Sequence, residues 1–408
     1  CSIMITFRNG LRILIKPNRS NNILAMSAFV DTGSIHETED ESGLTRLTSR
    51  LLLKGTQRRS ATDVAEEIES LGGDLEYYST EDYSGASAIV TADEADAALD
   101  LLGDVLFNPV FPADELEKER RLTLLEIKRK EDDKFGYTYQ EFRKILYAGH
   151  PYAKPAEGTP ETVQEFRAEQ LAEWHRAHFQ PGNMILTVVG PVEPDEFVKK
   201  LEGMFGAERP APQKRRVEAI TLMSDRRTHE LRKEIEQAFL CVGFLGPSAL
   251  DEDYVALRVA SAVLGEGMSS RFFYNLRDQH GLAYQIGCAI PARRGPGHVV
   301  GYIGTKPESL DAAREAMLAE MERLKTELVP DPELERAKNY IIGKYLIDHQ
   351  TNARQGFYLG WHELLGLGVE HDQLYPALVE KITAEQVLAA AQKYFSEPTI
   401  VTLFPSSS

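Results

Sequence analysis

The sequence of 408 residues has little cysteine, no long apolar run and a deficit of basic residues. Its three cysteines, at positions 1, 241 and 288, are too few and too scattered for a disulfide framework, and none belongs to a Cys-x-x-Cys pair. No stretch approaches the roughly 20 apolar residues that a membrane-spanning helix needs. We therefore expect neither a disulfide-stapled domain, nor a thiolate metal site, nor a transmembrane segment.

The charge balance is acidic, because 46 Lys and Arg face 63 Asp and Glu and leave a net charge of −17. A protein with this net negative charge repels the phosphate backbone of nucleic acids, so we expect no nucleic-acid partner. The contents of 42% hydrophobic and 27% charged residues are ordinary for a soluble globular protein. The length predicts two or three domains with sizeable cores. The compartment, cytoplasmic or periplasmic, stays open.

An internal repeat organises the chain, since four windows of the first half find partners in the second half, in order and at similar offsets. The windows are 25–34 with 238–248 (238 − 25 = 213), 111–118 with 329–336 (333 − 115 = 218), 168–171 with 384–387 (384 − 168 = 216) and 185–189 with 400–404 (400 − 185 = 215). We interpret the chain as two homologous halves of a duplicated α+β fold, each an antiparallel β-sheet packed with long helices.

The boundary between the halves lies where the sequence becomes polar, contains proline and loses its apolar period, at residues 208–216. We predict an N-terminal α+β domain over 1–207, a linker and entry strand over 208–236, and a homologous C-terminal domain over 237–408.

The first informative segment begins with Gly-Ser-Ile-His-Glu at 33–37 and continues as a leucine-striped helix that ends before Gly55. Arg46 and Arg50 are one helical turn apart, and Ser49 shares their face. Two arginines in this arrangement are commonly no more than a solvated helix face.

In this segment the chain resembles the pitrilysin and mitochondrial-processing-peptidase group of zinc peptidases. The pattern of that group is a Gly-Ser-x-x-Glu strand end, then a helix with His-x-x-Glu-His, then Lys-Gly-Thr. The two histidines ligate zinc from one helix face, and the glutamate between them activates the zinc-bound water. The matching positions here are Arg46, Ser49 and Arg50. The resemblance therefore implies that both histidine ligands and the general base are missing.

The third zinc ligand of the group is a downstream glutamate, with another glutamate seven residues before it, and Glu126 and Glu119 match these positions. A helix rich in Glu, Lys and Arg also supplies such a pair without any site. We expect no metal in this chain, and we predict that Arg46 or Arg50 pairs with Glu126 or Glu119, because two buried carboxylates need a counter-charge. The alternative is that the arginines point to solvent.

The second informative segment is residues 265–287, where a Gly/Ser turn leads into a helix, Gly281 ends that helix and an apolar strand follows. The glycines at 265 and 267 suggest a nucleotide loop only weakly, since no strand-GxGxxG-helix frame is present. Arg277 could also simply complement the dipole at a helix end.

This segment resembles the Leu-Gly-x-Gly-Met-Ser-Ser-Arg to Gly-Leu-Ala-Tyr stretch of the same group, in which an Arg and a Tyr seven residues apart handle the substrate. Arg277 and Tyr284 match that pair. The resemblance implies that the guanidinium binds a peptide carbonyl and that the phenol donates to the oxygen that becomes negative in the transition state.

The histidines offer no replacement metal site by spacing. His175 and His178 form His-x-x-His, but the second half has Ala391 and Tyr394 at the matched positions, so we expect structural or surface roles. We expect the other histidines to be isolated, each satisfied or solvated rather than a ligand.

In the two-chain members of the group, one subunit brings zinc and the other brings the Arg/Tyr pair. We expect this chain to be the second kind: a catalytically incomplete subunit of a heterodimeric zinc endopeptidase, with zinc in a homologous partner subunit and peptides as substrates. Two alternatives remain open, namely a non-catalytic scaffold resembling respiratory-complex core proteins, and a homodimeric peptide-binding module.

Overall fold

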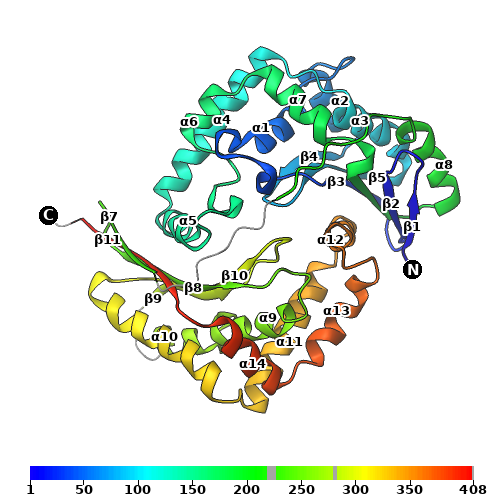
Figure 1. Ribbon diagram of the computed structural model, residues 1–408. Helices are drawn as coiled ribbons and strands as arrows, with labels where there is room; N and C mark the ends of the chain where they lie inside the picture. Colours follow the sequence, from blue (N-terminus) through cyan, green and yellow to red (C-terminus); the bar gives the residue numbers. More distant parts are fainter. Residues whose placement is uncertain (218–226, 279–282, 407–408) are drawn as a thin grey trace. The chain divides into compact units, whose positions relative to one another are not determined.

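The computed structural model describes residues 1–217, 227–278 and 283–406 of the chain. Contacts divide the chain into two compact units that are interleaved in sequence. The first unit takes Cys1–Lys128, Lys154–Ala219 and Asp348–Asp372, and the second takes Arg129–Ala153, Ile220–Ile347 and Gln373–Ser408. Figure 1 gives the labels of the helices and strands.

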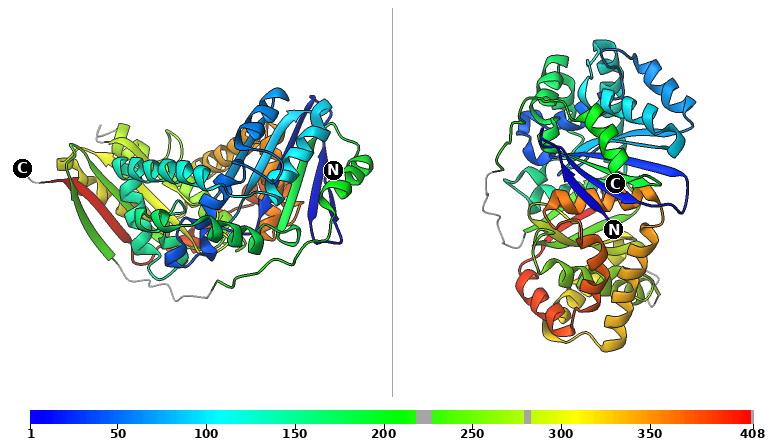
Figure 2. Two further views of the ribbon diagram at one scale, coloured as in Figure 1. Left: turned by 90° about the horizontal axis from the view of Figure 1, so that it is seen from above. Right: turned by 90° about the vertical axis from the view of Figure 1, so that its right-hand side faces the viewer.

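The first unit is built on a sheet with the strand order β1-β2-β6-β3-β5-β4. Neighbouring strands run antiparallel except β2 and β6, which run parallel. Figure 2 shows these strands side by side in blue, light blue and green. They are β1 (Ile3–Thr6), β2 (Arg12–Pro17), β3 (Ile23–Val30), β4 (Asp74–Ser79), β5 (Ser84–Thr91) and β6 (Met184–Gly190).

Helices cover both faces of this sheet. On one face α1 contacts β4 and β5 and α3 contacts β5, while α12 contacts β2, β3 and β6 on the other. The helices of this unit are α1 (Leu44–Leu51), α2 (Ala61–Ser70), α3 (Ala95–Phe107), most of α4 (Ala113–Asp132), α6 (Pro160–Glu165), α7 (Ala168–His178), α8 (Pro194–Phe205) and α12 (Asn352–Leu365).

Strand β3 shows why its sequence is apolar throughout. Alternate side chains of a strand point to opposite faces of the sheet, and Leu24, Met26 and Val30 enter the core on the α1 and α3 side. Phe29 points to the other face, where its ring centroid lies 6.1 Å from that of Phe357 in α12. A strand covered on both faces is therefore buried along almost its whole length.

The second unit has a sheet with the strand order β7-β11-β8-β10-β9, again antiparallel except for one parallel pair, β7 and β11. Within the described ranges no helix combines the length and apolar character needed to cross a membrane. The strands are β7 (Arg227–Lys233), β8 (Ala238–Gly246), β9 (Ala283–Ala289), β10 (Gly297–Thr305) and β11 (Thr399–Pro405).

Helices α9, α10 and α14 contact one face of this second sheet, and α5 lies on the opposite face, where it contacts β8 and β11. The main helices of the unit are α5 (Lys134–Leu146), α9 (Tyr254–Gly265), α10 (Leu310–Thr326), α11 (Asp331–Asp348), α13 (His371–Glu380) and α14 (Ala384–Tyr394).

The duplicated α+β fold is confirmed, because the order β2-β6-β3-β5-β4 of the first sheet repeats as β7-β11-β8-β10-β9 in the second. The four sequence windows fall on the matched pairs β3 and β8, α4 and α11, α7 and α14, and β6 and β11. The sheets are mixed rather than wholly antiparallel, since a long connection brings the last strand of each half alongside an early strand in parallel, β6 beside β2 and β11 beside β7.

The two halves also exchange one helix each. Helix α5 comes from the first half of the sequence and covers the second sheet, whereas α12 comes from the second half and covers the first sheet. The compact units therefore differ from the sequence halves, and the boundaries at 207, 208, 236 and 237 remain a prediction about the homologous halves.

Candidate functional site

A buried glutamate holds the amino end of α1. Glu37 accepts hydrogen bonds from the backbone N–H of Gly43 at 3.1 Å and of Thr45 at 2.7 Å. Gly43 has a φ of 92°, in the left-handed region that favours glycine. Burial raises the pKa of the Glu37 carboxyl to about 7, although these hydrogen bonds act in the opposite direction. The Gly-Ser-x-x-Glu stretch thus fixes where α1 begins.

The predicted ion pair between α1 and α4 is confirmed. Arg50 Nε donates to Glu119 Oε2 at 3.0 Å, and Arg50 Nη1 donates to Glu126 Oε1 at 2.8 Å. Arg50 and Glu119 are both buried. Burial alone would lower the pKa of Arg50, but the hydrogen bonds to the two carboxylates outweigh it and raise that pKa. One guanidinium therefore bridges both glutamates.

Further positive charge surrounds this pair. Arg46 Nη2 lies 3.7 Å from Glu126 Oε2, and Lys54 Nζ lies 3.6 Å from Glu119 Oε1. The guanidinium carbon of Arg50 lies 5.8 Å from the ring centroid of Tyr77 in β4, and burial raises the pKa of that phenol. We call Arg46, Arg50, Lys54, Glu119 and Glu126 the α1–α4 ion cluster.

The donor set at this cluster does not fit zinc. Arg46 and Arg50 bring cations to the positions where a zinc site needs neutral imidazoles. Ser49 is buried, and its hydroxyl donates back to the carbonyl of Thr45 at 2.8 Å, so it presents no group that could take a proton from water. Nowhere in the part of the chain that the structure describes do three or more His, Cys, Asp or Glu form a group that could hold a metal ion.

The Lys-Gly-Thr stretch after α1 forms a turn that a buried aspartate of α3 holds. Thr56 Oγ1 donates to Asp104 Oδ2 at 2.6 Å, and Arg59 Nη1 donates to the same oxygen at 2.8 Å. The hydrogen bonds from Thr56, Asn108 and Arg59 hold the pKa of Asp104 low despite its burial. This stretch therefore serves the packing of the first unit.

In the second unit, backbone geometry explains both glycines of the Gly-Glu-Gly-Met-Ser-Ser-Arg stretch at 265–271. A Cβ at Gly265 would lie 2.4 Å from the backbone nitrogen of Cys288, so the end of α9 can approach β9 only with glycine. Gly267 has a φ of 87°. These contacts favour a packing role over a nucleotide loop.

Arg277 lies in a π-helical turn, η6 (Phe273–Asp278), after that stretch. Its side chain is exposed, with the guanidinium carbon 5.1 Å from the ring centroid of Phe273. The backbone of Tyr284 belongs to β9, and its side chain lies outside the described residues. The proximity of the two side chains therefore remains a prediction.

His175 and His178 are buried in the first unit. The Nε2–H group of His175 donates to the carbonyl of Leu106 at 2.7 Å, and burial lowers the pKa of His175 to about 4. Burial likewise lowers the pKa of His178 to about 4. Both imidazoles are therefore neutral near pH 7, in packing positions.

Three histidines that the sequence presents as isolated lie around Asp372. His349 Nε2 lies 2.7 Å from Asp372 Oδ1, and His362 Nδ1 lies 3.8 Å from the same oxygen. The ring centroids of His362 and His371 are 4.8 Å apart. These three histidines are isolated in the sequence but lie together in the fold, because the chain through α12 brings residues 349 and 372 together.

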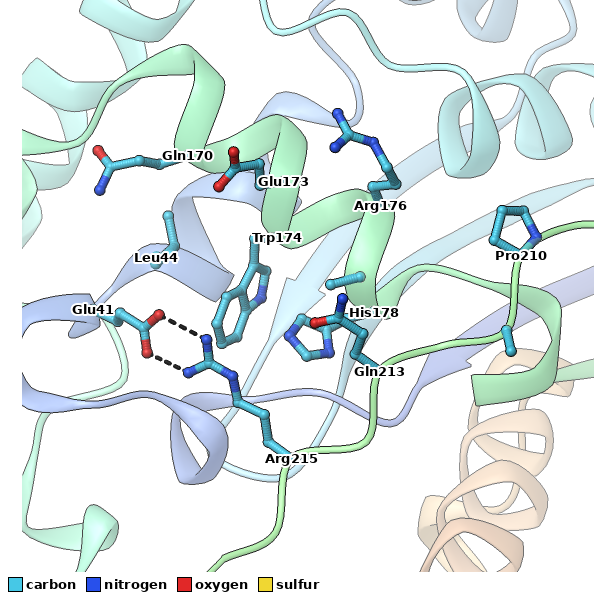
Figure 3. A pocket seen from close by; sticks show the side chains of 12 residues that line it. Glu41, Leu44, Gln170, Glu173, Trp174, Arg176, His178, Pro210, Gln213 and Arg215 are labelled. Carbon is cyan, nitrogen blue, oxygen red and sulfur yellow. Dashed lines mark hydrogen bonds and ion pairs between the residues drawn. The ribbon is translucent and has the colours of Figure 1, made fainter.

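A cavity of about 470 Å³ lies between α7 and the segment at residues 210–215 (Figure 3). Arg215 lies over the ring of Trp174, with its guanidinium carbon 4.8 Å from the ring centroid, and pairs with both carboxylate oxygens of Glu41 at 2.5 and 3.0 Å. Gln213 N–H donates to the carbonyl of Ala177 at 2.8 Å. These contacts hold residues 213–215 of the predicted linker against the first unit, whereas residues 227–233 form β7 of the second unit.

A fold of two matched α+β halves, with the Gly-Ser-x-x-Glu and Lys-Gly-Thr frame around α1, defines a class of peptidase-like proteins, and comparisons with known proteins agree. Residues 12–159 match the model "Insulinase (Peptidase family M16)", and residues 165–341 match "Peptidase M16 inactive domain".

The similar curated proteins extend over nearly the whole chain. An uncharacterized zinc protease of Bacillus subtilis, YmxG, is 30% identical over 404 residues, which are 98% of each chain. An uncharacterized zinc protease of Rickettsia felis is 26% identical and covers 96% of this chain and 94% of its own.

Two solved structures show the same fold. A protease from Helicobacter pylori superposes with a TM-score of 0.92 at 20% identity, over 99% of this chain and 100% of its own. A protein from Pseudomonas fluorescens titled peptidase M16 inactive domain also gives a TM-score of 0.92, at 22% identity, over 100% and 99%.

The chain therefore belongs to peptidase family M16. It is a pitrilysin-like, non-catalytic member, and its residues 46–50, Arg-Leu-Thr-Ser-Arg, contain neither a histidine nor a glutamate.

Proposed function

We propose that this chain is the catalytically incomplete subunit of a heterodimeric zinc endopeptidase and supplies Arg277 and Tyr284 to peptides whose cleavage is carried out at zinc in a homologous partner subunit. The observation that carries the proposal is the α1–α4 ion cluster, in which Arg50 bridges Glu119 and Glu126 and, together with Arg46 and Lys54, neutralises them. Chemistry at a metal must then come from another chain.

The roles of the two residues follow from their chemistry. The Arg277 guanidinium is exposed and can donate to a peptide carbonyl, which holds the extended substrate in place. The Tyr284 hydroxyl would donate to the carbonyl oxygen of the scissile bond as negative charge develops there, an interaction that is stronger in the transition state than in the ground state.

The test is a cleavage assay on the assembled pair. This chain is co-purified with a homologous subunit that carries an intact His-x-x-Glu-His motif, and turnover of an unfolded peptide is measured. We expect both Arg277→Ala and Tyr284→Phe to slow cleavage, and for Tyr284→Phe the loss in turnover should be on the order of a hundredfold, the usual cost of one lost oxyanion donor. The control is Arg314→Ala, which should change nothing: it removes another arginine of the second unit that, among the described residues, pairs with Asp311 and Glu315 of its own helix.

Unchanged turnover in both variants, with assembly intact, would favour the scaffold function instead. Cleavage or peptide binding by this chain alone, without a zinc-bearing subunit, would favour the homodimeric module.

A further inference from the structure

The arginine of the Gly-Met-Ser-Ser-Arg stretch is not a surface residue. Arg271 is buried at the start of the helical segment that leads into η6. Its Nε donates to Glu333 Oε1 of α11 at 2.6 Å, and its Nη1 lies 3.5 Å from Glu320 Oε2 of α10. The start of this segment is thus tied by charge to two helices of the second unit.

A second tie is made one helical turn later. Asn275, inside η6, donates from Nδ2 to Glu320 Oε1 at 2.9 Å. Glu320 is itself buried, with 8% of its surface exposed, so it can neutralise and bond its partners in a shielded environment. One carboxylate therefore holds the segment at Arg271 and at Asn275.

Glu320 has a further partner that does not belong to the segment. Arg323 lies on the same helix as Glu320 and donates to its two carboxylate oxygens at 3.0 and 3.1 Å. This pair separates two effects experimentally, because its loss removes a charge partner of Glu320 without releasing η6.

The contacts of Glu320 with Arg271 and Asn275 matter because η6, which carries Arg277, is a π-helical turn. A π-helical turn is rare and occurs mainly at functional sites, where it displaces side chains from the ordinary helical positions. Arg277 lies in this turn, two residues after Asn275, and among the described residues no carboxylate pairs with it. Among the described residues, the ring of Phe273 contacts the Arg277 guanidinium, and both residues belong to η6.

We propose that Glu320 is a positioning residue that, through Arg271 and Asn275, holds η6 in the conformation that presents Arg277 to a peptide. The inference rests on the proposed function for the role of Arg277, whereas the anchoring of η6 by Glu320 stands apart from it.

The test compares Asn275→Ala with Arg323→Ala. Hydrogen–deuterium exchange of peptides covering residues 271–278 is measured on the full chain, and kcat and KM are measured with the zinc-bearing subunit. We expect Asn275→Ala to speed exchange in 271–278 and to lower kcat roughly tenfold, as is typical when a residue that orients a functional group is lost. Arg323→Ala should leave exchange and kcat as they are. In an Arg277→Ala background, Asn275→Ala should lower kcat no further.

The outcomes separate the two hypotheses. Unchanged exchange in both Asn275→Ala and Glu320→Ala would overturn the anchoring. Faster exchange with unchanged kcat, in an assembly whose kcat depends on Arg277, would overturn the positioning role. Faster exchange in an assembly whose kcat is indifferent to Arg277 would support the anchoring and overturn the proposed function.

Discussion

Helices α1 and α4 of the first unit and helices α9 and α11 of the second unit occupy matching places in the two halves. Helices α1 and α9 start 254 − 44 = 210 residues apart, and helices α4 and α11 start 331 − 113 = 218 residues apart. By these offsets Arg50 corresponds to Ala260 and Glu119 corresponds to Ala337. Both alanines are fully buried in the apolar core of the second unit.

The difference teaches that this fold does not need an ion pair at these two positions, although Arg336 of α11 still donates to the carbonyl of Ala262 in α9. The second unit buries small apolar side chains at the positions where the first unit buries an arginine and a glutamate. A buried ion pair is often no more stabilising than apolar residues of similar volume. The charges of the first unit therefore call for a reason other than folding, and the proposed function supplies one: a former ligand set that the basic residues of the α1–α4 ion cluster now neutralise.

The largest loss of stability is expected when one partner of the α1–α4 ion cluster is removed. Arg50→Ala leaves Glu119 buried without its main counter-charge and should lower the free energy of unfolding by roughly 3 to 5 kcal/mol. Urea unfolding followed by tryptophan fluorescence measures it, since Trp174 and Trp361 both belong to the first unit. Lys54→Ala is the control, because Lys54 is partly exposed and its loss should cost below about 1 kcal/mol. Equal effects of the two substitutions would contradict the account.

The second difference between the units is a buried histidine, which should make the unfolding free energy of the first unit depend on pH. His175 corresponds to Ala391, which is buried in the second unit. The pKa of His175 is about 4 in the folded chain against an unperturbed 6.5, so the unfolded chain binds more protons between these values. Stability from the neutral imidazole is present above pH 6.5 and is lost as pH falls toward 4, by on the order of 3 kcal/mol.

His175→Ala should therefore weaken the acid dependence of the first unit's unfolding free energy, measured by urea titration between pH 7 and pH 4. His229→Ala, at an exposed position of β7, should leave that dependence unchanged. An identical pH dependence in wild type and His175→Ala would show that the buried imidazole is not the cause.

Replacing the buried ion pair by apolar side chains, like those of the second unit, should change the free energy of unfolding less than Arg50→Ala does. The double substitution Arg50→Met with Glu119→Leu removes both buried charges at once, and it should be close to neutral or stabilising by about 1 kcal/mol or more. Glu126 keeps Arg46 as a partner and is partly exposed, so it is not left as an isolated buried charge. A loss as large as that of Arg50→Ala alone would show that the fold does depend on the ion pair.

The smallest effect is expected at the exposed ion pair beside the Figure 3 cavity. Arg215→Ala should cost less than about 1 kcal/mol, because surface pairs contribute little. Its consequence should be local: trypsin should cut after Lys214 faster in the variant, since Arg215 holds this segment against Trp174 and Glu41. An unchanged cleavage rate would mean that the backbone bond of Gln213 alone holds the segment.

Much of this structure could be predicted from the sequence. The duplicated fold followed from repeated windows, and the bond between Arg50 and the two glutamates followed from charge: α1 and α4 are amphipathic, and unpaired carboxylates are not buried. The exchange of α5 and α12 could not be predicted, because helical periodicity shows which side of a helix is apolar but not which sheet it covers.

The histidines around Asp372 were also beyond the sequence. His349 and His362 are 13 residues apart, with no spacing typical of a shared helix face, and they meet only because α12 returns the chain to the same place. The ties of Glu320 to the segment before Arg277 have the same character, since they join residues 45 and 49 positions apart. Contacts of this kind depend on tertiary packing.

The central claim is that Arg46, Ser49 and Arg50 stand where a zinc motif would be, and zinc stoichiometry tests it most directly. Wild type and the triple variant Arg46→His, Ser49→Glu, Arg50→His are stripped of metal, reloaded with zinc and measured by elemental analysis. The account predicts no tightly held zinc at this site in wild type and about one equivalent in the variant, lost again on adding Glu126→Gln. An equivalent bound by wild type and lost on mutating Glu126, or a folded triple variant that gains no zinc, would contradict it.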